Sequence, residues 1–136
     1  MSIEEYGEIR IENEKSFILI RKKIREISNM LGFLITDITR IVTSASELIR
    51  NIIHYAGTGI VQWHIINNNN RTGIEMTFKD NGPGIPDIKK AMKEGYSTGN
   101  GLGFGLPGTK RLMDEMEIIS EVGKGTTVII KKWLKS

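Results

Sequence analysis

A glycine-rich stretch at residues 99–106 has four glycines in its first seven positions and is followed by Pro107 and Gly108. Each glycine costs backbone entropy on folding and adds no side chain to a core, so this number of glycines indicates a role other than packing. A polyphosphate requires bare backbone N–H groups on a loop that leads into a helix N-terminus. Pro107 suits the first turn of such a helix, which the composition extends over residues 109–116. The stretch therefore predicts an anion site, with an ordinary surface loop as the alternative.

Three polar residues, Glu47, Asn51 and His54, recur at helical spacing and therefore share one face of a predicted helix. A carboxylate can abstract a proton, and an amide oxygen can bind a hard cation. Any amphipathic helix carries polar residues opposite its apolar stripe, so a solvated face is the alternative interpretation.

A further polar stretch at residues 80–86 places the carboxylate of Asp80 at the end of a predicted strand. Two glycines, Gly82 and Gly84, and two prolines follow it, which favours a rigid turn with exposed backbone. Because Asp, Asn, Gly and Pro are the usual residues of turns, a plain turn is the alternative.

Two amphipathic helices and two hairpins are predicted to position these residues. Apolar spacing predicts one helix over residues 17–31, stopped by Gly32, and a second from an N-cap at Thr36 to Ala56. Alternating residues predict a strand over residues 8–12 and hairpins over residues 60–79 and 118–133. The first hairpin is predicted to turn through residues 67–72, and residues 87–94 are predicted to form a short helix.

Length and composition indicate one soluble globular domain over residues 1–136, with 39% apolar and 26% charged residues. The net charge is +3 and the basic residues do not interleave with aromatics, so no nucleic-acid partner is expected. No apolar run approaches the roughly 20 residues that span a bilayer, and no signal-peptide pattern is present, so no membrane association is expected. Cysteine is absent, which excludes disulfides and thiolate metal sites and is compatible with a cytoplasmic location.

Several phosphate-binding motifs are missing or out of context. The sequence has no G-x-x-x-x-G-K-[ST] stretch, which excludes a P-loop NTPase, and it lacks the H-R-D and D-F-G motifs of eukaryotic-type kinases. Residues 103–108 match the dinucleotide fingerprint G-x-G-x-x-G, but no buried strand directly precedes them, as that fingerprint requires.

Four motifs occur in a fixed order: Glu-x-x-x-Asn on a helix, an Asp-x-Gly-x-Gly turn, a Gly-x-Gly-x-Gly loop and a closing Gly-Thr. This order resembles the Bergerat ATP-binding fold of gyrases, Hsp90, histidine kinases and MutL. Residues 46–51 and the small size resemble the anti-sigma-factor serine/threonine kinases, and residues 80–88, 95–108 and 110–115 are most similar to the RsbT-type branch. The implied fold is an α/β two-layer sandwich with a mostly antiparallel sheet and helices packed on one face.

The resemblance implies a role for each motif residue. Glu47 matches the proposed general base, Asn51 matches the residue that holds Mg²⁺, and Asp80 matches the carboxylate that accepts from the adenine amino group. His54 matches a position where relatives often carry a basic residue near the phosphates. Tyr96, Ser97 and Thr98 belong to a short lid. The remaining implied nucleotide contacts are Gly82, Gly84, Ile85, Gly101, Gly103, Gly105, Leu106 and Thr126.

The implied activity is phosphorylation of a serine or threonine on a STAS-domain antagonist of the RsbS or RsbR kind, with ATP and Mg²⁺ as cofactors. Once released, such a kinase is expected to activate a PP2C-type phosphatase. Three alternatives stay open: an RsbW-like anti-sigma factor that binds a sigma factor, a detached histidine-kinase catalytic domain, and an ATP-gated binding module with little catalysis. The sequence leaves the oligomeric state open.

Overall fold

The structure is a computed structural model that describes residues 6–92 and 105–135. Along these residues the elements are β1 (Tyr6–Ile11), α1 (Glu14–Leu31), α2 (Ile35–Tyr55), β2 (Gly59–Asn68), β3 (Arg71–Asp80), α3 (Ile88–Ala91), α4 (Gly105–Leu112), β4 (Glu115–Glu121) and β5 (Gly125–Trp133). No helix in this part of the chain is both long enough and apolar enough to cross a bilayer.

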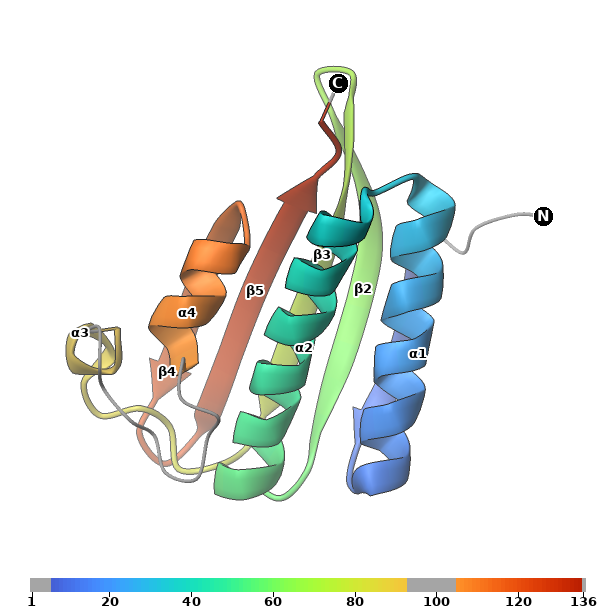
Figure 1. The fold of residues 1–136 in the computed structure, drawn as a ribbon. Coiled ribbons are helices and arrows are strands. Elements are labelled where there is room, and N and C mark those ends of the chain that lie inside the picture. The colour runs from blue at the N-terminus through green and yellow to red at the C-terminus, as the bar shows by residue number, and fades with distance from the viewer. Residues whose placement is uncertain (1–5, 93–104, 136) are drawn as a thin grey trace.

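The strands form one sheet in the order β1-β2-β3-β5-β4, and each pair of neighbours is antiparallel. Helices α1, α2 and α4 lie side by side across one face of the sheet (Figure 1). The predicted two-layer sandwich is therefore confirmed. β3 and β5 are neighbours although they are not consecutive, and their register pairs Asp80 with Thr126.

The core lies between the inner face of the sheet and the helices. Helical spacing on α1 and α2 and alternation on the central strands direct apolar side chains into this layer, as the sequence predicts. Gly7 of β1 lies directly under the Trp63 ring, which occupies the place of a Cβ. The core side chains of the two long helices and the central strands include Phe17, Ile20, Ile24, Ile27, Ile41, Ala45, Ile49, Ile52, Val61, Trp63, Ile74, Met76, Phe78, Val128 and Ile130.

Local signals set the ends of α1 and the turn of the first hairpin. The side chains of Asn13 and Ser16 form a reciprocal capping box at the start of α1, and Gly32 ends the helix with a φ of 95°. Asn69 and Asn70 have φ values of 50° and 67°, which gives a two-residue hairpin turn of the kind that matches strand twist. The strands therefore extend further into residues 67–72 than the sequence predicts.

Two predicted helix boundaries are wrong. α2 begins at Ile35, and its N-cap is Leu34, which makes no side-chain capping bond, so Thr36 is inside the helix. The helix expected over residues 109–116 ends at Leu112. The Asp114 N–H donates to the Lys131 carbonyl at 3.0 Å, so pairing with β5 captures the chain before another helical turn can form.

A buried ion network joins the start of α2 to the end of α4. Lys132, 5% exposed, donates to the Leu112 carbonyl at 2.9 Å and to Asp114 Oδ1 at 3.3 Å. Its ammonium also lies 3.8 Å from Oδ1 of Asp37, which Arg40 contacts at 2.8 Å. Every charge of this network has an opposite charge nearby, as buried charges require.

Candidate functional site

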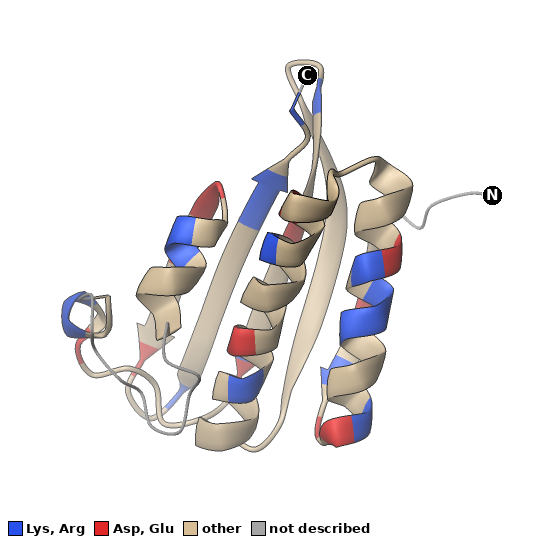
Figure 2. Cartoon of the chain, in the orientation of Figure 1, with Lys and Arg blue, Asp and Glu red and all other residues tan. Residues whose placement is uncertain are grey.

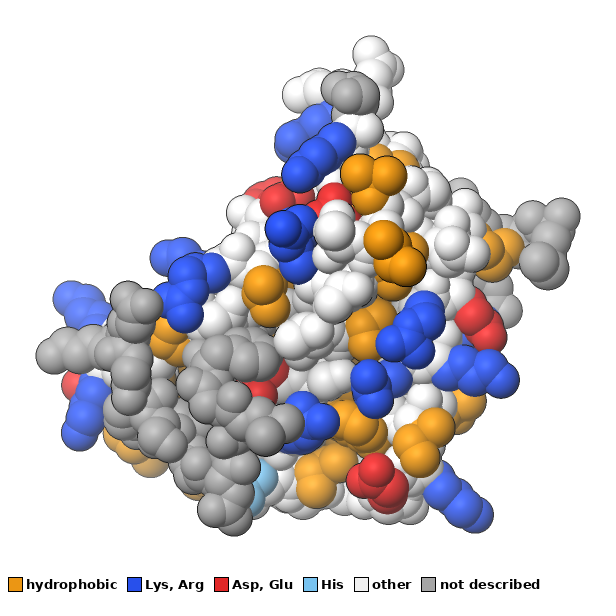
Figure 3. Space-filling model, in the orientation of Figure 1, with side chains coloured by type: hydrophobic (Ala, Val, Ile, Leu, Met, Phe, Trp, Pro, Cys, Tyr) orange, Lys and Arg blue, Asp and Glu red, His pale blue; other side chains and the backbone are white. Residues whose placement is uncertain are grey.

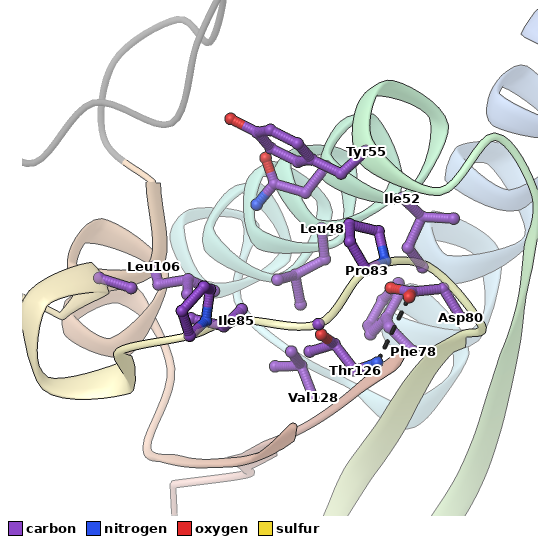
Figure 4. Close-up of a pocket in the computed structure, with 14 residues that line it drawn as sticks. Leu48, Ile52, Tyr55, Phe78, Asp80, Pro83, Ile85, Leu106, Thr126 and Val128 are labelled. Atoms are coloured by element: carbon purple, nitrogen blue, oxygen red, sulfur yellow. Dashed lines mark hydrogen bonds between the residues drawn. The ribbon is translucent and has the colours of Figure 1, made fainter. Parts of the chain in front are cut away.

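A pocket of about 200 Å³ opens where the C-terminal half of α2 faces the ends of β3 and β5. Figure 4 shows Leu48 of α2 across the pocket from Thr126 and Val128 of β5. Most of the wall is apolar, with few polar groups, which is the usual make-up of a small-molecule site. The lining residues are Leu48, Asn51, Ile52, Tyr55, Phe78, Asp80, Pro83, Gly84, Ile85, Pro86, Ala91, Leu106, Thr126 and Val128.

Asp80 is held at the end of β3 by backbone donors. Its Oδ1 accepts from the Gly82 N–H at 2.8 Å. The same oxygen accepts from the Thr126 N–H at 3.3 Å, the bond drawn in Figure 4. Both bonds fall on one oxygen, and no hydrogen bond to Oδ2 occurs within the described residues. A carboxylate fixed in this way can accept a further hydrogen bond from a ligand.

The glycines of the turn that follows Asp80 make close packing possible. A Cβ on Gly82 would lie 2.7 Å from the Ala56 Cβ at the end of α2. Gly84 has a φ of 79°, and its Cβ would overlap the backbone of Glu121. Only Gly84 lines the pocket, so the turn needs Gly82 for its contact with α2.

Ser120 on β4 is a site residue that the sequence did not single out. Its Oγ accepts from the Ile85 N–H at 2.7 Å and lies 2.8 Å from Thr126 Oγ1. These bonds connect the turn after β3 to the second hairpin behind the pocket. The signal was available, because Ser120 is a polar residue on an otherwise apolar face of a predicted strand and pairs with Thr126.

Helix α2 supplies the other polar groups. Asn51 is half-buried and lines the pocket. Glu47 lies one helical turn before it and is only 1% exposed, so the solvated-face interpretation is wrong for this residue. His54 is exposed, contacts the Tyr55 ring edge-on at 4.5 Å and does not line the pocket.

The Glu47 carboxyl is buried without a full set of partners. Its Oε1 has no hydrogen-bond partner in the described part of the chain. Burial raises the pKa of Glu47 above its usual range, and the Arg50 guanidinium one turn away partly opposes that shift. An unsatisfied buried carboxylate is costly to the fold, and such groups cluster at functional sites.

The glycine loop is described only where it enters α4. Gly101, Gly103 and the lid residues at 96–98 lie outside the described residues. Gly105 begins α4 with a φ of 53°, and Leu106 lines the pocket. Pro107 lies in the first turn, as predicted, and the buried Thr109 hydroxyl donates to the Gly105 carbonyl at 3.1 Å. The start of α4 therefore lies at the pocket.

Comparison with known proteins identifies relatives of this chain. Residues 36–136 match the family model described as histidine kinase-, DNA gyrase B-, and HSP90-like ATPase. The chain is 44% identical over 127 residues to serine/threonine-protein kinase RsbT of Bacillus subtilis, covering 93% of this chain and 96% of the relative. It is 38% identical over 105 residues to an anti-sigma F factor of Geobacillus stearothermophilus, covering 71% of this chain and 69% of the relative.

A solved structure gives the same picture of the fold. The RsbU and RsbW domains of a Mycobacterium tuberculosis protein match with a TM-score of 0.63 at 18% identity, covering 93% of this chain and 32% of that chain. The family match spans most of the chain, and the resemblance inferred from the motifs is confirmed. The chain therefore belongs to the family of histidine kinase-, DNA gyrase B-, and HSP90-like ATPases and, within it, to the RsbT-type serine/threonine protein kinases.

Proposed function

We propose that this protein transfers the γ-phosphoryl group of Mg-ATP to a serine or threonine of a STAS-domain protein. The observation that carries the proposal is the arrangement on α2, where buried Glu47 lies one turn from Asn51, and Asn51 shares a pocket with Asp80. Phosphoryl transfer needs a positioned acceptor, charge neutralisation at the phosphates and little covalent chemistry from the protein.

Different pocket residues would contact the adenine base and the phosphates of ATP. Asp80 would accept from the adenine amino group through Oδ2, with Thr126 and Ile85 beside the base. Leu106 and the α4 N-terminus would face the phosphates, where a helix start favours negative charge. The apolar walls from Leu48 and Val128 suit a flat, apolar base.

Asn51 fits the magnesium that the family uses. Its amide oxygen is a ligand that Mg²⁺ accepts, and Mg²⁺ bound to nucleotide commonly takes only one or two protein ligands beside phosphate oxygens and waters. The described residues contain no cluster of His, Asp and Glu that could hold a metal ion without nucleotide. Bound Mg²⁺ would neutralise charge on the phosphate oxygens.

Glu47 would act as the general base. The carboxylate takes the proton of the incoming serine or threonine hydroxyl as its oxygen bonds to the γ-phosphorus, and ADP leaves. Asn51, about 6 Å further along the helix axis, keeps the phosphates on the same side of α2. His54 is not assigned a role, since its side chain lies away from the pocket.

The partner-switching role follows from the charge that the reaction adds. A phosphate on a small interface introduces roughly two negative charges and can release the kinase. We propose that the released kinase then activates a PP2C-type phosphatase. The similarity to RsbT of Bacillus subtilis, to the anti-sigma F factor and to a solved structure of RsbU and RsbW domains supports a switching role of this kind.

The direct test is phosphotransfer from γ-labelled ATP and Mg²⁺ to a purified STAS-domain protein of the RsbS kind. We expect label on a serine or threonine, with the signal lost in Asn51→Ala. ATP binding without label on any protein substrate would overturn the kinase proposal in favour of an ATP-gated binding module.

The anti-sigma F relatives favour one second candidate, an anti-sigma factor that binds a sigma factor directly. Size-exclusion chromatography with purified sigma factor separates the two. Stable sigma binding together with no phosphorylation of the STAS protein would favour this second function.

Asp80→Asn tests the adenine contact. An asparagine can keep the acceptor for the Gly82 N–H and replaces the second oxygen by an amide donor, which would face the adenine amino group. Losing a hydrogen bond to a charged group costs about 1.5–3 kcal/mol, so we expect ATP to bind about 10–100-fold more weakly. Isothermal titration calorimetry measures this, and unchanged ATP affinity would remove Asp80 from the site.

A further inference from the structure

A second concavity runs between α1 and α2 on the side of the helices that faces away from the sheet. This groove encloses about 710 Å³ and shares no residue with the pocket at Asp80. Figure 3 shows apolar and basic side chains intermixed over these two helices. The groove is lined by Arg21, Lys22, Arg25, Glu26, Asn29, Ile35, Ile38, Thr39, Val42 and Thr43.

Positive charge in the groove is poorly compensated. Arg21, Lys22 and Arg25 face a single acidic side chain, Glu26, and Figure 2 shows this basic cluster in the middle of α1. Lys22 and Arg25 make no ion pair with any described residue. Arg21 lies over the Phe17 ring, and its buried Nε has no hydrogen-bond partner in the described part of the chain. The groove therefore attracts carboxylates.

Apolar surface lies beside these charges. Ile35 is 79% exposed and Leu34, at the connection between the helices, is 68% exposed. Ile18, one turn before the basic cluster, is 59% exposed, while Val42 forms the groove floor. Large exposed apolar side chains gathered beside a groove mark a protein contact surface.

The dimensions suit one partner helix. From Arg21 to Asn29 the helix advances about 12 Å, which is about two turns. Neighbouring helices pack with their axes about 8–10 Å apart, so a third helix can lie along the seam between α1 and α2. An amphipathic helix with an apolar stripe toward Ile35 and Val42 and carboxylates toward Lys22 and Arg25 would match both features.

We propose that this groove docks the protein substrate of the kinase through an acidic, amphipathic helix. The position of Glu47 identifies the occupant as the substrate, and in this respect the inference rests on the proposed function. Thr43, at the groove, and Glu47 are four residues apart on α2 and so lie one above the other, about 6 Å apart along the axis. A protein seated here lies one helical turn from Glu47, the residue that would accept its hydroxyl proton.

Other anionic macromolecules fit this surface less well. The groove lining contains no aromatic side chain on which bases could stack, unlike single-stranded nucleic-acid sites. A membrane surface meets a continuous projecting apolar face, whereas the exposed Ile18 and Ile35 stand beside a concave surface whose floor is Val42 at 3% exposure.

The test compares two charge-reversal variants of the full chain. Lys22→Glu/Arg25→Glu changes the groove, and Lys23→Glu/Lys135→Glu makes the same change of net charge at residues outside it. The probe is a fluorescein-labelled helical peptide with leucines at i, i+4, i+7 and i+11 and glutamates beside them. A peptide with lysines in place of the glutamates is its counterpart.

Fluorescence anisotropy should show binding of the acidic peptide to wild type and to the control variant. We expect the groove variant to bind it at least about tenfold more weakly, and the lysine peptide not to bind. Ile35→Asp should also weaken binding, and it should fold, since Ile35 is exposed in the first turn of α2, where aspartate is favourable. With the STAS-domain substrate, KM should rise about tenfold in the groove variant, while kcat and ATP affinity stay unchanged.

Equal peptide binding by wild type, groove variant and control would overturn the inference. It would also be overturned by binding to phosphatidylserine vesicles, sensitive to the same substitutions, without binding to the acidic peptide. Peptide binding does not depend on catalysis. A protein that binds the peptide in the groove but phosphorylates nothing would therefore refute the proposed kinase function and assign the groove to a partner other than a substrate.

Discussion

The first turn and the middle of α2 each bury a carboxylate, and the surroundings of these two carboxylates differ. Asp37, 3% exposed in the first turn, is paired with Arg40 at 2.8 Å and lies 3.8 Å from the Lys132 ammonium. Glu47, 1% exposed and about 15 Å further along the axis, has an oxygen without a partner in the described part of the chain. Paired buried charge is typical of structure, and unpaired buried charge is typical of function.

The two carboxylates therefore contribute differently to the protein. At the Asp37 end, the network with Lys132 and Asp114 ties together α2, α4 and β5. In the middle of α2, the chain tolerates the unsatisfied Glu47 carboxylate one helical turn before Asn51, which lines the pocket. Because Asp37 and Glu47 share one rigid helix, the ion network at Asp37 can hold Glu47 in position.

The largest expected effect comes from Glu47→Gln, which removes the charge and keeps the shape. Loss of a general base should slow phosphotransfer about 10²–10⁴-fold. The melting temperature should stay the same or rise, because an unpaired buried charge disappears. Single-turnover phosphotransfer and thermal unfolding measure the two effects. A variant that keeps the wild-type rate would show that the base lies elsewhere.

Lys132→Met, which changes the surroundings of Asp37, should lower the stability of the fold and leave the rate nearly unchanged. It leaves the Asp37 and Asp114 carboxylates without their shared cation and should destabilise the fold by about 3–5 kcal/mol, with kcat of the folded enzyme nearly unchanged. Urea unfolding measures the loss. Lys131→Met is the matched control, since Lys131 is partly exposed, lies 3.5 Å from Glu75 and should cost at most about 1 kcal/mol. Equal losses of unfolding free energy in both variants would contradict a stabilising role for the buried network at Asp37.

Arg50→Gln tests the surroundings of Glu47 and should have the smallest effect of the three substitutions. Glu47 must be ionised to accept a proton, and burial raises its pKa, so the acid limb of the rate lies above the pH expected for an ordinary glutamate. The Arg50 charge opposes this rise, so its removal should move the limb to still higher pH. This shift of the acid limb should be less than about one pH unit, because Arg50 is exposed and its charge is screened by solvent. A pH–rate profile measures it, Arg50→Lys should restore it, and a downward move would contradict the assignment.

The sequence predicts where the polar side chains lie along the chain better than it predicts their burial. Helical spacing places Glu47 and Asn51 on one face of a helix, and alternation places Asp80 at a strand end, and in the structure these residues lie one turn apart on α2 and at the end of β3. The spacing also grouped Glu47 with a solvated face, because an amphipathic pattern shows which side of a helix meets the core and not what packs against its other sides.

The parts that could not be predicted depend on contacts between distant segments. Pairing of Asp114 with β5 ends α4 early, and that pairing is invisible in the local composition of residues 109–116. The burial of Asp37 beside Lys132, which comes from the end of β5, has no signal in the residues around position 37. The polar position of Ser120 on its strand is visible in the sequence, but its partner Ile85 is 35 residues away, and no local pattern indicates that bond.

The pairing of β3 with β5 has a consequence for how the protein folds. Hairpins β2–β3 and β4–β5 form from contacts between residues close in sequence. The Asp80–Thr126 contact instead joins two residues that are 46 positions apart. Contacts of such separation form late, because loop-closure entropy must be overcome first. The pocket spans this seam, so it exists only after the two hairpins dock. A nucleotide that binds there would therefore select the fully assembled chain, and cellular ATP would act as a check on completed folding.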